Sequence, residues 1–529
     1  MSDLSQALDQ MRSFIQQGEF AKAEKIGLSV YKHHKNDVAL NKGLALAINF
    51  QDRAQEACMY FTKACQLDEN DVDAHYNLAT LCLMLGHYKK AEKTFVTLLA
   101  KGQKQAQIYQ NYINVLLKQK KKEQALTIFA EAFDLYPDHY EIGSLYVAAY
   151  EEVNQLEDAW AILEKLPPSG LRHLMEARLY RREKKIDQAL DAILQCDENK
   201  LDSSVLAEFY LERGLIQDKA EKYEDAFASF NTSNQQMAKQ STHTRLNPQG
   251  FIEDLDRLKA IYQRSPVRKD IPTEGKRVAF FVGFPRSGTT LMEQMLKSHS
   301  KIVTTDEKSP FEYLIQQERK GRTLQQIWDE WREKDLRWQR IRFWQIVDEF
   351  GFHVDKDGLL VDKLPLNIVW APFIRLLFPG CPLIVAYRDP RDVCLSAFIQ
   401  KFSLNNAMAN FLDWNQTGQT YDQVMSVWEV AKDTLGGKYL EYRYEDLIDE
   451  FEQTIKQVID YLGLSFEEGI YEYRKLTQQR DVNTPSYREV INPLNKDAIK
   501  RYKNYPDQID QISPYIQKWV AKFGYNKQA

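Results

Sequence analysis

A glycine-containing segment near the middle of the chain has the features of a phosphate-binding loop. Residues 277–296 read R-V-A-F-F-V-G-F-P-R-S-G-T-T-L-M-E-Q-M-L. The apolar run 278–282 predicts a buried strand. A turn containing two glycines follows, and then apolar residues recur at helical spacing. A strand, glycine loop and helix in this order direct backbone N–H groups and the positive end of a helix dipole at an anion.

The loop differs from that of a nucleoside triphosphatase at one position. Gly283, Gly288 and Thr290 have the spacing of the pattern G-x-x-x-x-G-K-[ST]. Thr289 stands where the pattern has a Lys, and Arg286 lies inside the loop. Triphosphate sites use that Lys and a Mg²⁺ on the β- and γ-phosphates, so a shorter phosphate group suits this loop better. The alternative is an ordinary strand-to-helix turn of an α/β domain.

A second cluster of polar residues, Y-R-D-P-R-D-V-C-L-S, follows another predicted strand. Arg388 closes the strand, and Ser396 lies in the first turn of a helix predicted from Val393. An Arg and a Ser placed in this way can bind one phosphate, and Arg makes bidentate contacts that Lys cannot make. Arg391 and Asp392 could instead form a local ion pair at the start of the helix.

Together, the two segments resemble the nucleotide-binding motifs of the sulfotransferases, which use 3′-phosphoadenosine-5′-phosphosulfate (PAPS) as sulfuryl donor. The resemblance implies that the glycine loop holds the 5′ phosphosulfate end of the donor. The loop residues would be Arg286, Ser287, Gly288, Thr289 and Thr290. It also implies that Arg388 and Ser396 hold the 3′-phosphate. Because PAPS has no γ-phosphate, a sulfotransferase would not need the missing Lys.

Further matches are similar to the protein-tyrosine sulfotransferases in particular and extend over residues 276–505. Glu307 has the spacing of the catalytic Glu of that group, and Lys363 precedes the second motif at the interval found there. Tyr444 matches a contact to the adenosine nucleotide. Ser486 matches a donor-binding Ser in the closing segment of the domain.

Three positions depart from the pattern of the animal enzymes. Asn492 stands in place of a phosphate-binding Lys, Lys401 in place of an Arg, and Glu489 in place of a Gln. The animal enzymes also carry a membrane anchor, and a repeat array fused before a sulfotransferase is more similar to bacterial proteins. The departures keep open the alternative of a vestigial nucleotide domain in an interaction protein.

The resemblance implies a catalytic role for four side chains. Glu307 would remove the proton from the acceptor hydroxyl, a contribution of about 10²–10⁴-fold in rate. Lys363 would neutralise charge on the bridging oxygen of the departing nucleotide, and Arg286 and Ser486 would hold sulfuryl or phosphate oxygens. No metal is expected. The alternatives are that Glu307 is an acid at the start of a helix and that Lys363 pairs with Asp362.

The first half of the chain contains a repeat. Alanines recur at an interval of 34 residues, at Ala23, Ala57, Ala91 and Ala125, which is the period of the tetratricopeptide helix–turn–helix unit. Looser units follow, so about seven helix pairs are expected over residues 4–238. This part resembles a tetratricopeptide-repeat solenoid, in which each repeat is stabilised by its neighbours. Its groove could bind a peptide or protein, or the array could be a scaffold or an oligomerisation arm.

The predicted fold class is therefore α + α/β. An all-α solenoid (4–238) is followed by a connecting helix and linker (239–275) and a P-loop-like sulfotransferase domain (276–525). Strands from residues 359, 383 and 438 alternate with helices in this domain. Such alternation predicts a parallel sheet that binds ligands at the carboxyl ends of its strands.

Composition limits the function classes further. The net charge of −5 argues against bulk nucleic-acid binding. The six cysteines are scattered and predict buried free thiols. The N-terminus lacks the pattern of a signal peptide, and no apolar run is long enough for a membrane anchor, so a cytoplasmic location is expected.

The sequence thus predicts a PAPS-dependent sulfotransferase that releases PAP. The expected acceptor is a hydroxyl group of a peptide or protein, with tyrosine favoured, and the repeats would recruit this substrate or a protein partner. A carbohydrate or small-molecule acceptor is an alternative, and a nucleotide kinase is a more distant one.

Overall fold

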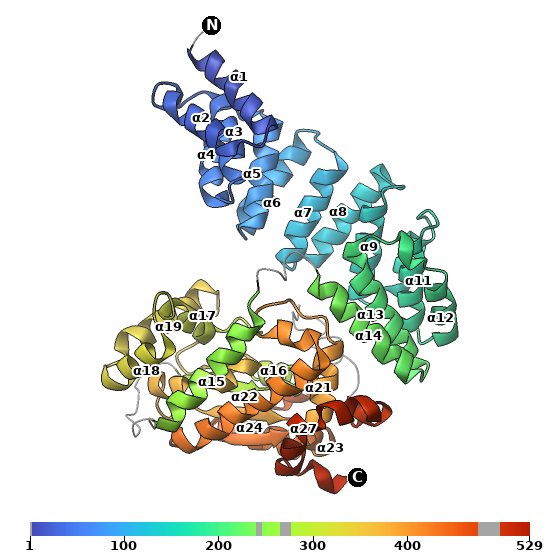
Figure 1. Ribbon diagram of the computed structural model, residues 1–529, viewed down its shortest axis with the longest axis vertical. Helices are drawn as coiled ribbons and strands as arrows, with labels where there is room; N and C mark the ends of the chain where they lie inside the picture. The colour runs from blue at the N-terminus through green and yellow to red at the C-terminus, as the bar shows by residue number, and fades with distance from the viewer. Residues whose placement is uncertain (1–2, 240–245, 265–276, 474–497, 529) are drawn as a thin grey trace. The chain divides into compact units, whose positions relative to one another are not determined.

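The computed structural model describes residues 3–239, 246–264, 277–473 and 498–528 (Figure 1). The chain forms two compact units, Met1–Asp197 and Glu198–Ala529. The first contains only helices, and the second contains a parallel sheet and its covering helices. The predicted combination of a helical solenoid and an α/β domain is therefore confirmed.

The first unit consists of successive helix pairs. In its described residues these are α1 (Asp3–Gln16) with α2 (Phe20–His34), α3 (Val38–Asn49) with α4 (Ala54–Leu67), α5 (Val72–Met84) with α6 (Tyr88–Ala100), α7 (Ala106–Lys118) with α8 (Lys122–Leu135), α9 (Tyr140–Glu152) with α10 (Leu156–Leu163), and α11 (Gly170–Arg182) with α12 (Ile186–Leu194). The four periodic alanines lie on the second helix of successive pairs and are fully buried. Their small side chains allow close approach of neighbouring helices, so the sequence period marks the packing surface.

A seventh helix pair, α13 (Ser203–Lys219) and α14 (Tyr223–Ala238), belongs to the second unit. Phe227 of α14 stacks on Phe398 with 5.1 Å between ring centroids, and its ring edge meets Trp414 at 5.4 Å. The buried Asn234 side chain donates a hydrogen bond of 2.9 Å from Nδ2 to the carbonyl oxygen of Phe398. This hairpin thus packs on the α/β domain.

Five parallel strands form the sheet, in the order β2-β3-β1-β4-β5. They are β1 (Arg277–Gly283), β2 (Ile302–Thr304), β3 (Leu359–Lys363), β4 (Leu383–Tyr387) and β5 (Leu440–Arg443). The strand β2 was not expected, because its three residues are too few to show a hydrophobic pattern.

The remaining helical segments of the second unit lie between and after the strands. They are η1 (Glu198–Lys200), α15 (Pro248–Arg264), α16 (Thr289–Lys297), α17 (Pro310–Glu318), α18 (Leu324–Glu333), α19 (Arg337–Glu349), η3 (Pro365–Trp370), α20 (Ala371–Leu377), α21 (Pro390–Ile399), η4 (Met408–Leu412), α22 (Trp414–Thr434), α23 (Tyr444–Asp449), α24 (Phe451–Tyr461), η5 (Glu468–Glu472), η7 (Arg501–Asn504), α27 (Pro506–Lys522) and η8 (Tyr525–Gln528).

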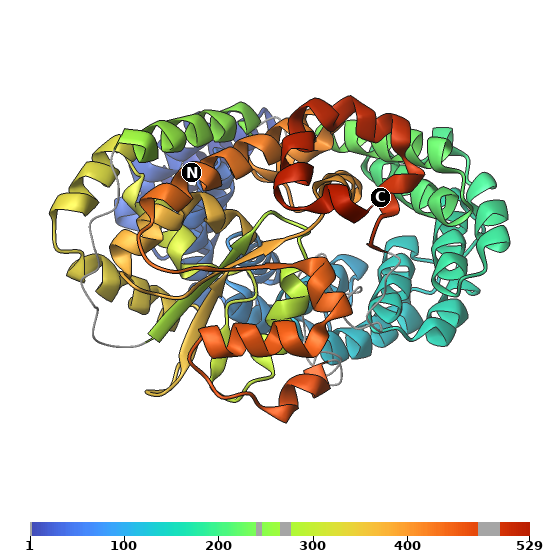
Figure 2. The ribbon, with the colours of Figure 1, turned by 90° about the horizontal axis from the view of Figure 1, so that it is seen from below.

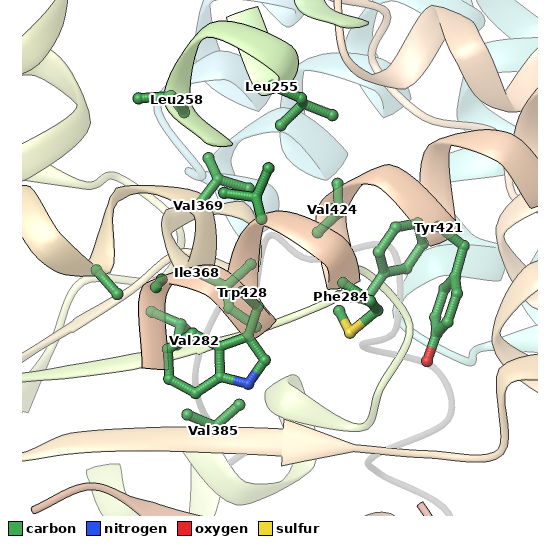
Figure 3. Close-up of a cluster of buried hydrophobic side chains, with 14 of the residues drawn as sticks. Leu255, Leu258, Val282, Phe284, Ile368, Val369, Val385, Tyr421, Val424 and Trp428 are labelled. Atoms are coloured by element: carbon green, nitrogen blue, oxygen red, sulfur yellow. The ribbon is translucent and has the colours of Figure 1, made fainter. Parts of the chain in front are cut away.

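The two faces of the sheet are covered by different helices (Figure 2). Alternate residues of β1 point to opposite faces. Val282 packs in one core with side chains of α15, η3 and α22, as Figure 3 shows for Leu255, Val369 and Trp428. Phe281 packs in the other core with residues of α16 and α24. Both faces of β1 are thus buried, and only its carboxyl end can present polar groups to a ligand.

Two helix boundaries differ from those expected. The helix that carries Ser396 begins at Pro390 rather than Val393, because the Asp389 side chain accepts a hydrogen bond from the Arg391 amide and caps it. Ser396 therefore lies in the second turn. The expected helix over 444–462 is two helices, α23 and α24, that meet at Glu450, where φ is −123°.

All six cysteines are free and buried, as the sequence predicts. Across the described ranges, every helix is too short or too polar to span a bilayer.

Candidate functional site

The residues predicted to carry chemistry lie at or just after the carboxyl ends of the parallel strands. The glycine loop follows β1, and Arg388 follows β4 directly. Lys363 is the last residue of β3, and Glu307 lies three residues beyond β2. Because parallel strands end at one edge of a sheet, this topology gathers side chains from distant parts of the sequence.

The glycine loop has a strained backbone that brings it close to a neighbouring ring. Arg286 and Gly288 have φ values of 72° and 79°. A positive φ is unusual for a residue other than Gly, so the backbone at Arg286 is strained. A Cβ atom on Gly288 would lie 2.2 Å from Cδ2 of Tyr444, so only Gly fits. Ser287, Thr289 and Thr290 are buried at the N-terminus of α16.

Hydrogen bonds join this loop to the second predicted motif. Arg286 Nε donates to Ser396 Oγ at 2.9 Å, and Arg388 Nη1 donates to the carbonyl oxygen of Arg286 at 3.1 Å. The Arg388 guanidinium lies over the Tyr444 ring, 4.9 Å from its centroid. Four of the predicted donor-binding side chains are therefore in one contact network.

The Arg388 guanidinium is suited to bind an anion. The residue is 6% exposed, and its Nε has no hydrogen-bond partner in the part of the chain that the structure describes. Its other two nitrogens donate to backbone carbonyls, of Arg286 and of Ala498 at 2.6 Å. A buried donor without a partner is costly. A phosphate group would satisfy it, so these residues fit the phosphate groups of PAPS.

Arg391 and Asp392 do not form the local ion pair considered above. Arg391 pairs instead with Asp389, with 2.6 Å between Nη2 and Oδ2. Asp392 is buried and accepts hydrogen bonds from the amides of Lys500 and Tyr502. Burial raises the pKa of Asp392 to about 6, although the nearby Arg388 opposes this change.

On the other side of β1, Lys363 lies between two carboxylates. Its Nζ is 2.7 Å from Glu307 Oε1 and 2.8 Å from Glu293 Oε2, and Lys363 and Glu293 are both fully buried. Burial alone would lower the pKa of Lys363, but the two carboxylates outweigh it and raise the pKa. Lys363 is thus a buried cation.

Asp362 does not pair with Lys363, because successive strand residues point to opposite faces of the sheet. It accepts hydrogen bonds of 3.1 Å from Ser309 Oγ and from the Phe311 amide. Burial raises the pKa of Asp362 to about 7, although these hydrogen bonds oppose the change. Asp362 therefore supports the start of α17.

Glu293 belongs to the site, and the sequence did not point to it. Its Oε1 accepts a hydrogen bond of 3.0 Å from the Asp306 amide, next to Glu307. Burial raises the pKa of Glu293 to about 7, while Lys363 opposes the shift. An acid among apolar residues in the first turns of α16 resembles an ordinary exposed position. Its place in the helix that directly follows the glycine loop was the one signal that could have identified it.

Glu307 is not the cap of the following helix. Ser309 caps α17, since its Oγ accepts a hydrogen bond of 3.0 Å from the Glu312 amide. Asp306 and Glu307 both have positive φ values, 47° and 66°. This backbone turns the Glu307 side chain to Lys363 and leaves it 31% exposed. Glu307 can therefore contact both Lys363 and a bound molecule.

A cavity of about 830 Å³ contains part of this site. The glycine loop and Glu307 line it at one side, and so does Lys401, the position where the animal enzymes have an Arg. The rest of the wall is mixed. Its apolar side chains include Leu246, Phe251, Ile315, Leu364, Leu366, Val369, Trp370, Phe402, Leu404 and Met408, and its polar side chains are Glu312, Gln316, Arg319, Asn367, Ser403, Asn405 and Asn406. Such a volume and lining are typical of a pocket for a small molecule or a side chain.

Other predicted residues remain untested by the structure. Ser486 and the departures at Glu489 and Asn492 lie outside the described residues. In the ranges that are described, no three His, Cys, Asp or Glu side chains are grouped so as to hold a metal ion.

Two family models match the chain. Residues 279–468 match the sulfotransferase family. Residues 51–111 and 116–173 match the tetratricopeptide repeat. The chain is thus similar to tetratricopeptide repeats in its first half and to the sulfotransferase family in its second half. This confirms the resemblance drawn from the motifs.

Relatives differ in how much of the chain they match. An uncharacterised protein of Aquifex aeolicus is 24% identical over 421 residues, which is 77% of this chain and 54% of that protein. Protein-tyrosine sulfotransferase A of Caenorhabditis elegans is 23% identical over 52% of this chain and 75% of its own length. Protein-tyrosine sulfotransferase 2 of Gallus gallus is 22% identical over 47% and 70%. This chain thus spans about half of the Aquifex relative and more of the two sulfotransferases.

Among solved structures, the chain matches MamA 41-end of Desulfovibrio magneticus RS-1. It is 18% identical, covers 31% of this chain and 93% of its own, and has a TM-score of 0.30.

Proposed function

We propose that this protein transfers a sulfuryl group from PAPS to a hydroxyl group of a peptide or protein, with tyrosine favoured, and releases PAP. The observation that carries the proposal is the position of Glu307. It accepts a hydrogen bond from the buried cation Lys363 and lines the same cavity as Arg286 of the glycine loop. A proton acceptor, which is paired with a buried cation, thus lines one cavity together with an anion-binding loop.

The donor would be held by groups on both sides of β1. The loop residues from Arg286 to Thr290 would bind its 5′ end, while Arg388, Ser396 and Tyr444 would bind its 3′-phosphate and adenosine. The contacts among Arg286, Ser396 and Arg388 support this placement, because they bring the two motifs within reach of one nucleotide. Ser486 remains a proposed donor contact from its sequence position alone.

When bound, PAPS supplies the sulfuryl group, whose bond to the donor phosphate oxygen breaks as its bond to the acceptor oxygen forms. Glu307 takes the proton that the acceptor hydroxyl loses. Lys363 donates a hydrogen bond toward the charge that develops on the leaving oxygen, and Arg286 holds anionic oxygens beside it. Positioning and charge stabilisation account for most of such a transfer, and none of these residues requires a metal for its role.

The cavity supports an aromatic acceptor. Phe251, Trp370 and Phe402 provide wall area against which a phenol ring can pack. A phenol has a pKa near 10, well below that of an alkyl alcohol, and so needs less help from a base. The similarity to protein-tyrosine sulfotransferases points to the same acceptor.

A carbohydrate or small-molecule acceptor is a second candidate. Gln316, Asn405 and Asn406 also line the cavity, and amide side chains can bind several hydroxyl groups of a sugar.

The repeats would recruit the acceptor or a protein partner. A cytoplasmic location stays a prediction from the N-terminal sequence, and fractionation of cells tests it.

Transfer of labelled sulfate tests the proposal directly. The purified chain is incubated with labelled PAPS and, in parallel, with a tyrosine-peptide library, glycans and simple phenols. We expect transfer to peptides that Glu307→Gln abolishes. Transfer to glycans alone would select the second candidate. Absence of transfer to every acceptor, together with absence of PAP binding, would favour a vestigial domain.

A further inference from the structure

The last helix pair of the repeat region holds a segment that touches the donor motif. Asp218, near the end of α13, is 9% exposed. Its carboxylate pairs with Arg501, with 2.9 Å between Oδ2 and Nη2. The same carboxylate accepts a hydrogen bond of 2.5 Å from Tyr505 Oη. One buried acid thus binds both ends of η7, which lies almost three hundred positions later in the chain.

The residues just before and within η7 are bonded to the second predicted motif. The amides of Lys500 and Tyr502 donate to Asp392 at 2.7 and 2.9 Å. The carbonyl oxygen of Ala498 accepts a hydrogen bond of 2.6 Å from Arg388 Nη2. Segment 498–505 therefore has the donor motif on one side and Asp218 on the other.

Aromatic contacts support both connections. The Arg391 guanidinium lies 3.9 Å from the centroid of the Tyr502 ring. On the opposite side, the ring of Tyr223 in α14 meets Tyr505 edge to face at 5.6 Å. Segment 498–505 is thus held between α21 and the α13–α14 hairpin.

We infer that the α13–α14 hairpin is a positioning element of the donor site, in which Asp218 fixes segment 498–505 and thereby orients Arg388. The carbonyl oxygen of Ala498 is one of two backbone acceptors that hold the Arg388 guanidinium, so its position helps to set the direction of the unpaired Nε. A repeat hairpin thereby becomes part of the nucleotide-binding unit. The inference rests on the proposed function only for the identity of the anion.

Substitution of Asp218 separates this role from simple packing. In full-length Asp218→Asn, we expect the dissociation constant of PAP and the KM for PAPS to rise at least about fivefold, within the usual range of coupling between sites. The KM for the acceptor and the kcat at saturating PAPS should stay near the wild-type values. Asp218→Glu should recover part of the affinity. Asp225→Asn, an exposed acid on the same hairpin, is the matched control.

Amide hydrogen exchange gives a readout that needs no nucleotide. We expect the amides of Lys500 and Tyr502 to exchange faster in Asp218→Asn than in the wild type or Asp225→Asn, while the strands of the sheet keep their protection. If Asp218→Asn does not fold, Tyr505→Phe removes one hydrogen bond to the same carboxylate and should show the same changes to a smaller degree.

The outcomes distinguish the two proposals. Wild-type exchange at 498–505 and wild-type PAP affinity in folded Asp218→Asn would overturn the inference and leave the proposed function intact. Absence of PAP binding to the wild type would contradict the proposed function, whereas faster exchange in Asp218→Asn would still support the structural role of the hairpin.

Discussion

The two sides of strand β1 differ in how their buried cations are compensated. Toward β3, Lys363 contacts two carboxylates, those of Glu293 and Glu307. Toward β4, Arg388 lies against backbone carbonyls and an aromatic ring, and within the described chain no carboxylate is at ion-pair distance from it. The first side presents a carboxylate, Glu307, that can accept a proton, and the second can accept an anionic ligand.

This difference assigns separate tasks to the two sides. A cation that is already paired contributes little to the affinity for a bound phosphate, although it can still stabilise the extra charge that develops on the leaving oxygen during transfer. A buried guanidinium with an unsatisfied donor gains fully from an anion. The side toward β3 therefore carries the proton transfer and the side toward β4 carries nucleotide affinity, so substitutions on the two sides should affect different kinetic constants.

Glu307→Gln should give the largest effect. We expect kcat to fall by about 10²–10⁴-fold, because the amide cannot accept the acceptor proton. The affinity for PAP should change by less than about twofold, since Lys363 keeps Glu293 as its partner. Steady-state kinetics and calorimetric titration measure the two quantities. Glu333→Gln, an exposed acid on α18, serves as the control; equal loss of activity there would point to a nonspecific cause.

Lys363→Met should reduce both activity and stability. We expect kcat to fall by about 10²–10³-fold. The free energy of unfolding should fall by about 3 kcal/mol, because Glu293 remains buried without its cation. Adding Glu293→Leu removes that second charge and should restore much of the stability without restoring activity. Recovery of activity in the double variant would show that Lys363 has no chemical role.

Arg388→Met should affect nucleotide affinity rather than the chemical step. We expect the dissociation constant of PAP to rise by about 10–100-fold, the loss expected for hydrogen bonds to a charged group, with kcat at saturating PAPS changed much less. Arg337→Met, on the exposed surface of α19, is the matched control. An unchanged PAP affinity would remove the proposed difference between the two sides.

Asp362→Asn should change the pH dependence of stability. The pKa of Asp362 is about 7 in the folded chain because of burial, above its ordinary value of 3.8. Between these values the folded chain binds a proton that the unfolded chain lacks, so this group stabilises the fold below pH 4 and the contribution is lost as pH rises to about 7. The difference between the two pKa values corresponds to about 4 kcal/mol, and we expect the variant to remove most of this loss. Chemical denaturation between pH 4 and 8 measures the free energy of unfolding. If its pH dependence in Asp362→Asn equals that of the wild type, the raised pKa of Asp362 is contradicted.

In Asp362→Asn, the free energy of unfolding should still fall as pH rises, because Glu293 and Asp392 contribute a pH dependence of the same sign. Burial also raises the pKa of these two carboxyl groups, to about 7 and about 6.

The sequence was sufficient to predict the fold class because both parts have periodic patterns. Buried alanines at a fixed interval reveal the repeats, and apolar runs alternating with helices reveal the parallel sheet. The short strand β2 and the break at Glu450 were not predictable, because neither changes the hydrophobic pattern. Likewise, nothing in the pattern shows that α13 and α14 pack with the second unit, since repeat helices look alike wherever they pack.

For the site, motif spacing identified residues but not their contacts. Lys363 and Asp362 are neighbours in sequence, yet they face opposite sides of the sheet. Glu293 was missed because its partner Lys363 lies on β3, far away in the sequence. Asp218 was missed for the same reason, because its partners Arg501 and Tyr505 lie far away in the sequence.

Calorimetric titration of PAP into the wild type, Glu307→Gln and Arg388→Met measures directly which side of β1 provides the nucleotide affinity. We expect micromolar binding to the wild type and to Glu307→Gln, and binding at least about tenfold weaker to Arg388→Met. Equal affinity in all three, or absence of binding to the folded wild type, would contradict the division of tasks between the two sides of β1.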